Sequence, residues 1–271
     1  MRRWSGSRAS EPDTMQRIHE AFADAPDPGA LIIYLTAGDP SLDATVELAL
    51  AAERGGADLI ELGIAYIAPT ADGPTIQAAC KRALDAGSTT AGVLDAARRI
   101  REQSQIPLVT MTCVNPIIAY GLDDFARDAR AAGIDGVLVS DLPPAEATEW
   151  CEAAARHDLG TVFLIAPDNT DAQIRDALDL TTGFAYIISR PGTTGARADI
   201  YEGLRPLIER VEMMASVPAA VGFGLSTGEQ VAEVLNAADG AVVGSAVVSV
   251  IAEGGDDLPA RVEAKVRELR G

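Results

Sequence analysis

The sequence is poor in the residues that build disulfide frameworks and metal sites. Its 271 residues include three cysteines, Cys80, Cys113 and Cys151, and two histidines, His19 and His157. The cysteines are odd in number, widely spaced and without a CxxC pair, so neither a disulfide scaffold nor a zinc site is predicted. Free thiols fit a reducing cytosol, and we therefore expect a cytoplasmic protein without a bound metal.

Basic residues and long apolar runs are also scarce. The chain has 22 Lys and Arg against 40 Asp and Glu, a formal net charge of −18. Such a surface repels a phosphate polyanion, so no nucleic acid is expected as partner, although backbone amides can still bind a small anion locally. No apolar run reaches the roughly 18 residues of a membrane-spanning helix, and the polar start MRRWSGSRASEPD lacks the apolar core of a signal peptide. We expect no membrane association.

The sequence is rich in apolar residues, which make up 48% of the chain and are enough for a large core. A loose polar segment and a short helix at 14–23 come first, and eight apolar strands then alternate with helices. Continuous apolar strands between helices indicate a parallel sheet covered on both faces, and eight such units favour a closed barrel. We predict a flexible tail at 1–13 and one (β/α)8 TIM-barrel domain with an extra N-terminal helix at 14–271. The strands are expected within 31–40, 58–64, 107–112, 135–141, 160–167, 183–189, 218–224 and 240–245, and the helix after the third strand at 122–132.

Two carboxylates lie at the end of the second predicted strand and in the loop after it. Glu61 stands among apolar residues of the strand, where a carboxylate is costly without a partner or a task. Asp72 follows in a loop punctuated by prolines and glycine, ahead of a helix that begins near Thr75. Both face the strand end where barrels carry their chemistry, so they form a candidate acid/base pair. The alternative is structural: Asp72 caps the helix, and backbone amides hold Glu61.

Three glycine clusters follow the sixth, seventh and eighth predicted strands, at 189–197, 222–227 and 240–248. Glycine allows close approach of an anion to the backbone, and a helix N-terminus adds N–H groups and a favourable dipole. Gly244 and Ser245 begin a helix directly after the last strand. Since loops after strands seven and eight are the usual phosphate site of these barrels, a phosphate site is predicted here. The alternative is that the glycines only make tight turns.

With these features together, the chain resembles the tryptophan synthase α subunit family from about Leu31 to Val248. The resemblance implies a TIM barrel and a lyase of tryptophan biosynthesis. Members of that family cleave indole-3-glycerol phosphate into indole and glyceraldehyde 3-phosphate by a retro-aldol reaction, without a cofactor. The matching segments are LTAGDP (35–40), ELGI (61–64), ADGPTIQAA (71–79), NPI.AYG (115–121), SDLPP (140–144), SR.G.TGAR (189–197), VGFG.ST (221–227) and VVGSA (242–246).

The resemblance also implies a role for each matching residue. Glu61 matches the general acid/base that protonates the indole C3 and helps to deprotonate the glycerol hydroxyl. Asp72 matches the carboxylate that accepts the indole N–H and stabilises the cationic indolenine. Tyr186 matches a tyrosine beside the catalytic acid, and Tyr34 stands where the family has an aromatic ring over the indole. Thr194 matches the threonine that contacts the Asp72 loop when the site closes. The matches to the phosphate binders are Gly195, Gly224, Gly244 and Ser245.

The loop between the two acids departs from the family. Where the family reads ELGxPFSDPLADGP, this chain reads ELGIAYIAPTADGP, with Ala65, Tyr66, Ile67 and Ala68 in place of Pro-Phe-Ser-Asp. In the family that segment packs against the β subunit and carries the closing signal between the two active sites. Its aspartate, lost at Ala68, would pair with the partner. A further departure is the usual Tyr-Tyr at 113–114, which here reads Cys-Val.

Three functions are consistent with this mixture. The retained acids and glycines indicate an indole-3-glycerol phosphate lyase that acts alone or in a specialised indole pathway. A second interpretation is an ordinary α subunit that needs a β subunit for activity. A third is a catalytically poor scaffold that activates a β-like partner, against which the retention of Glu61 and Asp72 argues. Tyr66 and Ile67 either pack inward or form a new apolar contact patch, and both arrangements fit the sequence.

Overall fold

A computed structural model describes residues 14–68, 72–189, 203–222 and 224–271, so the predicted tail at 1–13 lies outside the described residues. Within these ranges, none of the helices is long and apolar enough to span a membrane. The strands are β1 (Ala30–Ala37), β2 (Leu59–Ile64), β3 (Leu108–Thr112), β4 (Gly136–Val139), β5 (Gly160–Val162), β6 (Leu164–Ile165), β7 (Ala185–Ile188), β8 (Ala219–Gly222) and β9 (Gly240–Val243). The α-helices are α1 (Thr14–Asp24), α2 (Leu42–Gly55), α3 (Pro74–Asp85), α4 (Thr90–Arg101), α5 (Val114–Tyr120), α6 (Leu122–Ala131), α7 (Thr148–Arg156), α8 (Asp171–Leu180), α9 (Leu204–Met214), α10 (Gly228–Leu235), α11 (Ser245–Glu253) and α12 (Leu258–Arg270), and a 3₁₀ turn, η1, covers Pro144–Glu146.

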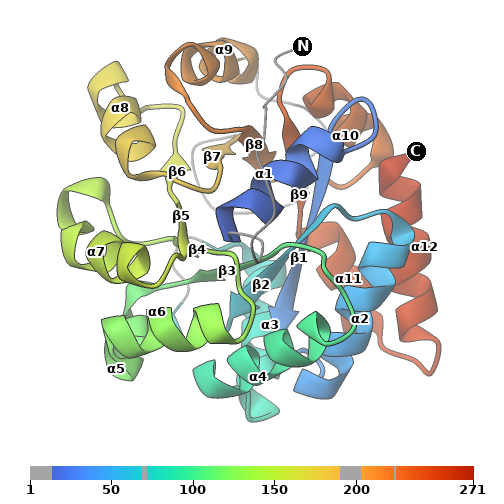
Figure 1. Ribbon diagram of the computed structural model, residues 1–271. Coiled ribbons are helices and arrows are strands. Elements are labelled where there is room, and N and C mark those ends of the chain that lie inside the picture. The colour runs from blue at the N-terminus through green and yellow to red at the C-terminus, as the bar shows by residue number, and fades with distance from the viewer. Residues whose placement is uncertain (1–13, 69–71, 190–202, 223) are drawn as a thin grey trace.

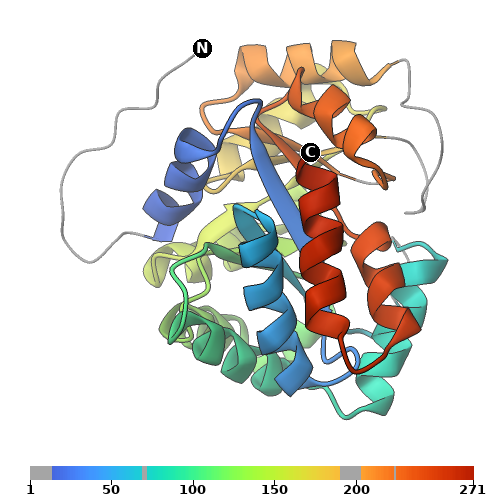
Figure 2. The same ribbon diagram turned by 90° about the vertical axis from the view of Figure 1, so that its right-hand side faces the viewer.

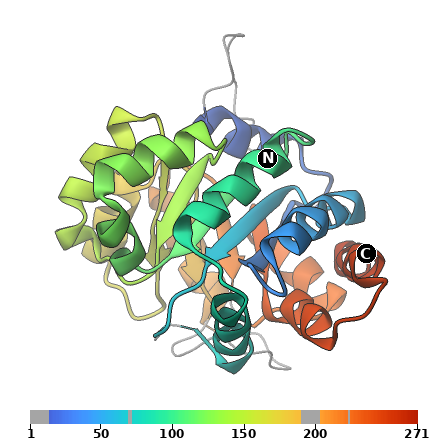
Figure 3. The same cartoon turned by 90° about the horizontal axis from the view of Figure 1, so that it is seen from below.

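The strands form one parallel sheet that curls into a barrel, with the helices arranged around it (Figures 1 and 3). The nine strands follow the order β5-β4-β3-β2-β1-β9-β8-β7-β6. Its two outermost strands, β5 and β6, are separated along the chain by Phe163 alone. They therefore share the place of one barrel strand, and the order returns to its start. The predicted TIM barrel with an N-terminal helix is confirmed.

Two local features differ from the prediction. The strand expected at 160–167 is interrupted at Phe163, which gives β5 and β6. Helix α5 was not predicted, because Pro116 suggests a break in the sequence. The proline lies in the first turn of α5, where its missing N–H would have no helical acceptor. Gly121, at φ 101°, then separates α5 from α6 in a conformation that favours glycine.

Strand alternation determines which side chains enter the barrel. On β2, Ile60, Leu62 and Ile64 pack in the cluster between sheet and helices, whereas Leu59 packs in the cluster inside the barrel. Successive side chains of a strand point to opposite faces, so Glu61 faces the interior with Leu59. Both faces of the sheet are buried, which explains why the strands read as continuous apolar runs.

Helix α1 closes the N-terminal opening of the barrel (Figure 1). Its Ile18 and Phe22 pack against the interior cluster. Ile18 lies over Gly136, Gly160 and Gly183 at the starts of neighbouring strands, where an added Cβ would lie 3.2–3.6 Å from its Cδ1 atom. Glycine at these positions leaves the room that the isoleucine side chain occupies. The barrel is consequently sealed at the end opposite the predicted site.

The last helix completes the ring around the sheet. Helix α12 lies beside α2 (Figure 2), and Arg54 of α2 pairs with Glu263 of α12 at 3.0 Å. At the end of α12, Arg270 donates to the carbonyl oxygens of Gly56 at 3.1 Å and Gly29 at 2.8 Å, and pairs with Asp58. These bonds tie the end of the chain to the starts of β1 and β2.

We predict that Ile18→Ala lowers the free energy of unfolding by about 2–5 kcal/mol, because it leaves a cavity in a fully buried position. Glu20→Ala, at an exposed position of the same helix, should change it by less than about 0.5 kcal/mol. Denaturant titration of both variants measures the difference. Equal stabilities would show that α1 does not contribute to the core.

Candidate active site

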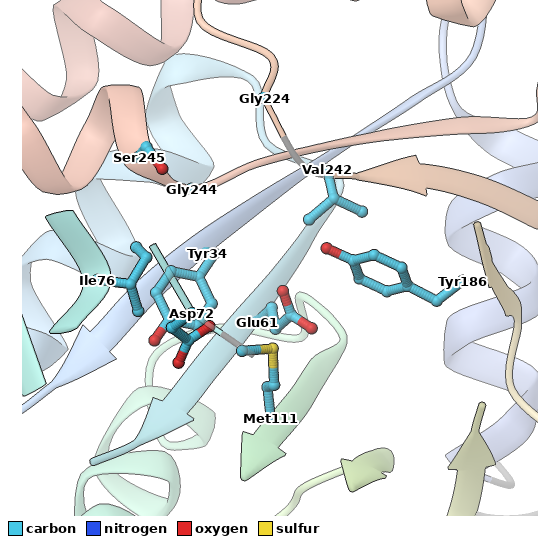
Figure 4. Close-up of a pocket in the computed structure, with 10 residues that line it drawn as sticks. All are labelled: Tyr34, Glu61, Asp72, Ile76, Met111, Tyr186, Gly224, Val242, Gly244 and Ser245. Carbon is cyan, nitrogen blue, oxygen red and sulfur yellow. The ribbon is translucent and has the colours of Figure 1, made fainter. Parts of the chain in front are cut away.

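A small cavity of about 30 Å³ lies at the carboxyl ends of the strands and brings most of the predicted site residues together (Figure 4). Two predicted residues, Thr194 and Gly195, lie outside the described residues. Three apolar lining residues, Ile76, Met111 and Val242, were missed. Strand alternation could have found Met111 and Val242, since each lies two positions from an inward or site residue. The predicted residues that line the cavity are Tyr34, Glu61, Asp72, Tyr186, Gly224, Gly244 and Ser245.

Glu61 projects into this cavity from the middle of the sheet. It lies on β2 between Tyr34 of β1 and Val109 of β3, and only 1% of its surface is exposed. Its Oε1 atom is buried without a hydrogen-bond partner. The alternative in which backbone amides hold this carboxylate is therefore wrong for Oε1. A buried carboxylate oxygen without a partner is costly and marks a functional group.

Asp72 reaches the same cavity from the loop that precedes α3. The residue is 7% exposed, and its Oδ1 atom is also buried without a hydrogen-bond partner. Gly73 occupies the N-cap position of α3, and no side chain caps the helix there. The capping alternative for Asp72 is consequently wrong. The Gln77 side chain instead donates to the Asp72 backbone oxygen at 2.8 Å, which anchors the residue and leaves its carboxylate to the cavity.

Burial separates the protonation states of the two acids. It raises the pKa of Glu61 to about 8, and the negative charge of Asp72 adds to the effect. It raises the pKa of Asp72 to about 6. At pH 7, Glu61 is therefore mostly protonated and Asp72 mostly ionised. The cavity thus holds one proton donor and one anion side by side, the arrangement that acid/base chemistry requires.

Two buried tyrosines lie beside the acids in the cavity, and two glycines leave room for the tyrosine rings. A Cβ atom at Gly63 would lie 2.1 Å from the Tyr34 hydroxyl, and one at Gly222 would lie 2.2 Å from the Tyr186 hydroxyl. Thr36 donates to the Tyr34 hydroxyl at 3.2 Å. Burial raises the pKa of both phenols, which keeps them neutral. Sequence reasoning missed this use of the glycines, although a glycine inside a strand is a signal of close approach.

The opposite side of the cavity can hold an anion. Gly244 caps α11, whose first turn contains no acidic residue. Its carbonyl accepts from the Val247 and Val248 N–H groups, so the N–H groups before them have no acceptor within the helix. Gly224 faces this turn with a φ of 92°, a conformation that favours glycine. None of the described lining residues is basic, so an anion would be bound by backbone N–H groups and the helix dipole.

A metal ion has no comparable site within the described ranges. No group of three or more His, Cys, Asp or Glu residues there is placed to hold one. The thiols nearest the cavity, Cys80 and Cys113, are buried, and burial raises the pKa of each to about 11. Neutral thiols are poor metal ligands and poor nucleophiles. The chemistry available in the described cavity is therefore that of the two carboxylates.

Comparisons with known proteins point to one family. A family model described as tryptophan synthase alpha chain matches residues 21–270. The tryptophan synthase alpha chain of Solibacter usitatus is 48% identical over 243 residues, which cover 89% of this chain and 91% of the relative. Among solved structures, the tryptophan synthase complex of Pyrococcus furiosus contains a chain with 40% identity and a TM-score of 0.83, covering 89% of this chain and 97% of that one. A chain of Mycobacterium tuberculosis tryptophan synthase has 36% identity and a TM-score of 0.86, covering 93% and 96%.

The buried state of Glu61 predicts a pH-dependent stability difference between the wild type and Glu61→Gln. Because folding raises this pKa from 4.5 to about 8, the unfolded state releases the proton first, and the wild type loses stability as pH rises through that window. From pH 5 to pH 9, Glu61→Gln should gain stability relative to the wild type on the order of 4 kcal/mol. Urea titrations at both pH values measure the gain. A stability difference between the two proteins that does not change with pH would contradict the raised pKa of Glu61.

Proposed function

This chain belongs to the tryptophan synthase α-chain family, and from that membership we propose how its residues divide the reaction between them. The reaction is the cleavage of indole-3-glycerol phosphate to indole and glyceraldehyde 3-phosphate, a carbon–carbon lyase step. One observation carries the proposal: Glu61 and Asp72 are both buried, each has an oxygen without a hydrogen-bond partner, and both line one cavity. The protonation states of these two acids determine which of them donates a proton and which carries a negative charge.

Glu61 both donates and recovers the proton. In its protonated form it protonates C3 of the indole, and the ring becomes a cationic indolenine. The resulting carboxylate then removes the proton from the hydroxyl on the carbon attached to C3. That carbon becomes the aldehyde, the bond to C3 breaks, and its electron pair returns to the ring. Glu61 ends protonated as it began, which a pKa of about 8 supports at neutral pH.

Asp72 stabilises the charge that this protonation creates. Its carboxylate accepts the hydrogen bond of the ring N–H, whose nitrogen carries the positive charge of the indolenine. A pKa of about 6 keeps Asp72 ionised at neutral pH. In a water-poor cavity the attraction between this anion and the indolenine is stronger than in bulk water. The anion would therefore stabilise the transition state more than the neutral ground state.

The tyrosines and glycines position the substrate around these acids. We assign Tyr34 to the face of the indole ring and Tyr186 to the surroundings of Glu61, since both line the cavity (Figure 4). The phosphate is assigned to Gly224, Gly244 and Ser245 at the start of α11. Thr194 and Gly195 keep the roles that the family resemblance implies for them, loop contact and phosphate binding.

We predict a bell-shaped pH dependence of kcat/KM for indole release from indole-3-glycerol phosphate. Activity should rise through about pH 6 as Asp72 ionises and fall through about pH 8 as Glu61 loses its proton. Glu61→Gln and Asp72→Asn should each lower kcat by about 100-fold or more. Spectrophotometric assays across this range, with indole quantified as the product, measure the profile.

Matched controls are available at exposed acids on neighbouring helices. Glu209→Gln on α9 and Asp179→Asn on α8 change the same chemical groups outside the cavity and should retain wild-type activity. Full activity in Glu61→Gln would contradict the proposed mechanism. Absence of turnover in the wild type, alone and with a β subunit, would contradict the lyase function itself.

A β subunit is the partner that we propose for the face around the mouth of the barrel. The solved relative from Pyrococcus furiosus is described as an α2β2 complex with mutual activation. In this chain, Ile67 is 83% exposed and Ile118 is 58% exposed. The Asn115 side chain donates to the Tyr66 hydroxyl at 3.0 Å, which joins the loop after β2 to α5. This joined surface replaces a charged contact of the family with an apolar one.

A groove beside Ile67 extends the same surface. It measures about 700 Å³ and runs from the loop after β2 along α3, where Pro74, Ala78 and Leu84 line it. Exposed apolar side chains next to a groove are typical of protein-binding surfaces. The sequence allowed Ile67 either to pack inward or to be exposed. In the structure this side chain is exposed. We propose that a β subunit covers Ile67 and organises the loop that carries Asp72.

We predict that Ile67→Asp raises the dissociation constant for a tryptophan synthase β subunit by about tenfold or more, because it buries an unpaired charge in the contact. Turnover of the wild type should rise on addition of the β subunit, and this rise should be smaller for Ile67→Asp at equal concentrations. Met213→Asp serves as the control, since Met213 is 77% exposed at the C-terminal end of α9, which leads to the sealed end of the barrel. Equal affinities of all three proteins would contradict the proposed contact, and full turnover of the isolated chain, unchanged by the β subunit, would favour a stand-alone lyase.

A further inference from the structure

The wall of the barrel opposite the phosphate side contains a polar group that the mechanism does not use. The alternation that turns Leu138 inward and Val139 outward also turns Ser140 inward. Its backbone N–H donates to the Thr112 oxygen at 2.8 Å, which extends the pairing of β4 with β3 by one residue. Ser140 thus begins the turn after β4 and is held to β3 above the interior cluster, at the carboxyl end where the substrate enters.

Two apolar neighbours complete this wall. Met111 on β3 and Leu164 on β6 pack against the interior cluster and remain partly exposed. Met111 also lines the cavity that holds Glu61 and Asp72. Met111, Ser140 and Leu164 together form what we call the far wall. It presents one hydroxyl between two apolar side chains.

The proposed substrate pose brings the benzene ring of the indole to the far wall. Glu61 contacts C3 and Asp72 contacts the ring N–H, while the phosphate lies beside Gly244 at the start of α11. These contacts use the edge of the five-membered ring that carries C3 and N1. The fused benzene ring must then point away from them, toward the strands β3, β4 and β6. This step rests on the proposed function.

The Ser140 hydroxyl has hydrogen-bonding capacity to offer there. It donates to the Thr112 carbonyl at 3.3 Å, a long bond, and lies 3.9 Å from the Cys113 thiol. A serine hydroxyl combines one donor with two acceptor lone pairs, so it can also accept from a ligand. Burial raises the pKa of Cys113 to about 11, so the thiol beside it stays neutral and does not repel a polar group.

There is also room beyond the far wall. A groove of about 450 Å³ shares Ser140 and Leu164 with it and continues between the loops after β4 and β6. Its other lining residues include Leu142 and Ala166 of these loops, and Phe163 and Ala177, which pack between the sheet and the helices.

We infer that the far wall favours an indole-3-glycerol phosphate whose benzene ring carries a small hydrogen-bonding substituent, a hydroxyl or an amino group. Ser140 accepts the hydrogen bond of the substituent and acts as a specificity-determining residue. Met111 and Leu164 contact the carbon edge of the ring. The thiol of Cys113 lies 3.9 Å from the serine hydroxyl and packs beside it.

The test compares ring-hydroxylated substrates with methylated substrates of the same size. The kcat/KM values of the 4-, 5-, 6- and 7-hydroxy isomers are each divided by that of the corresponding methyl isomer, which removes the contribution of bulk. For at least one position this ratio should exceed 1 by about 3- to 10-fold in the wild type, the effect of one neutral hydrogen bond. Ser140→Ala should bring the same ratio close to 1. Ser216→Ala, at an exposed turn before β8 at the sealed end, should leave it at the wild-type value.

The outcomes separate this inference from the proposed function. Ratios at or below 1 for every position, or a preference that survives Ser140→Ala, would overturn the inference while cleavage of the unsubstituted substrate upholds the lyase function. Cleavage of no substrate, substituted or not, would overturn the lyase function and the inference with it. Thermal unfolding of each variant shows whether a change in ratio comes from a folded enzyme.

Discussion

The rest of this structure depends on one constraint: two buried carboxylates line the same cavity, and each has an oxygen without a hydrogen-bond partner. Elsewhere the chain pairs its buried acids. Asp135 is fully buried and contacts the guanidinium groups of Arg17 and Arg101, and Asp39 receives two hydrogen bonds from Arg82. Glu61 and Asp72 lack such partners at Oε1 and Oδ1. Their burial is destabilising by itself, and the closely packed barrel and its surrounding helices must offset that cost.

The fold could be predicted from the sequence because its signals are local and repeated. Apolar runs of strand length that alternate with helices are typical of a parallel sheet covered on both faces, and this chain contains eight of them. Errors arose where one residue has two structural meanings. Pro116 signals a break in most contexts, yet it fits the first turn of α5. The interruption at Phe163 depends on pairing with strands on either side, which no local pattern encodes.

Most of the residues that line the cavity could be named from the sequence, but the way their side chains are arranged could not. The place of Glu61 at the end of an apolar strand, the place of Gly244 and Ser245 after the last strand, and the family resemblance together indicated these residues. Whether Asp72 caps a helix or faces a cavity depends on its side-chain orientation, and aspartate before a helix is compatible with both. Gly63 and Gly222 are another example, because their purpose becomes visible only when the rings of Tyr34 and Tyr186 are in place. Long-range contacts of this kind have no signature within a short stretch of sequence.

The interior and the rim of the barrel are under different constraints. In the interior, Glu61 lies between β1 and β3, and Tyr34 packs against α3 and α11, so a change in one of them disturbs its neighbours. Ile67 is largely exposed, so its identity is limited mainly by what binds there. The acids can thus be retained while the loop between them changes.

The seal formed by α1 has a further consequence for the movement of molecules. With Ile18 and Phe22 filling one end of the barrel, substrate and products have to use the other end. That is also the face on which we place the β subunit. The charged substrate, indole-3-glycerol phosphate, would then enter and the apolar product, indole, would leave through the same end of the barrel that the partner covers. A partner bound there would control the rates of substrate entry and product release without contacting any reacting atom.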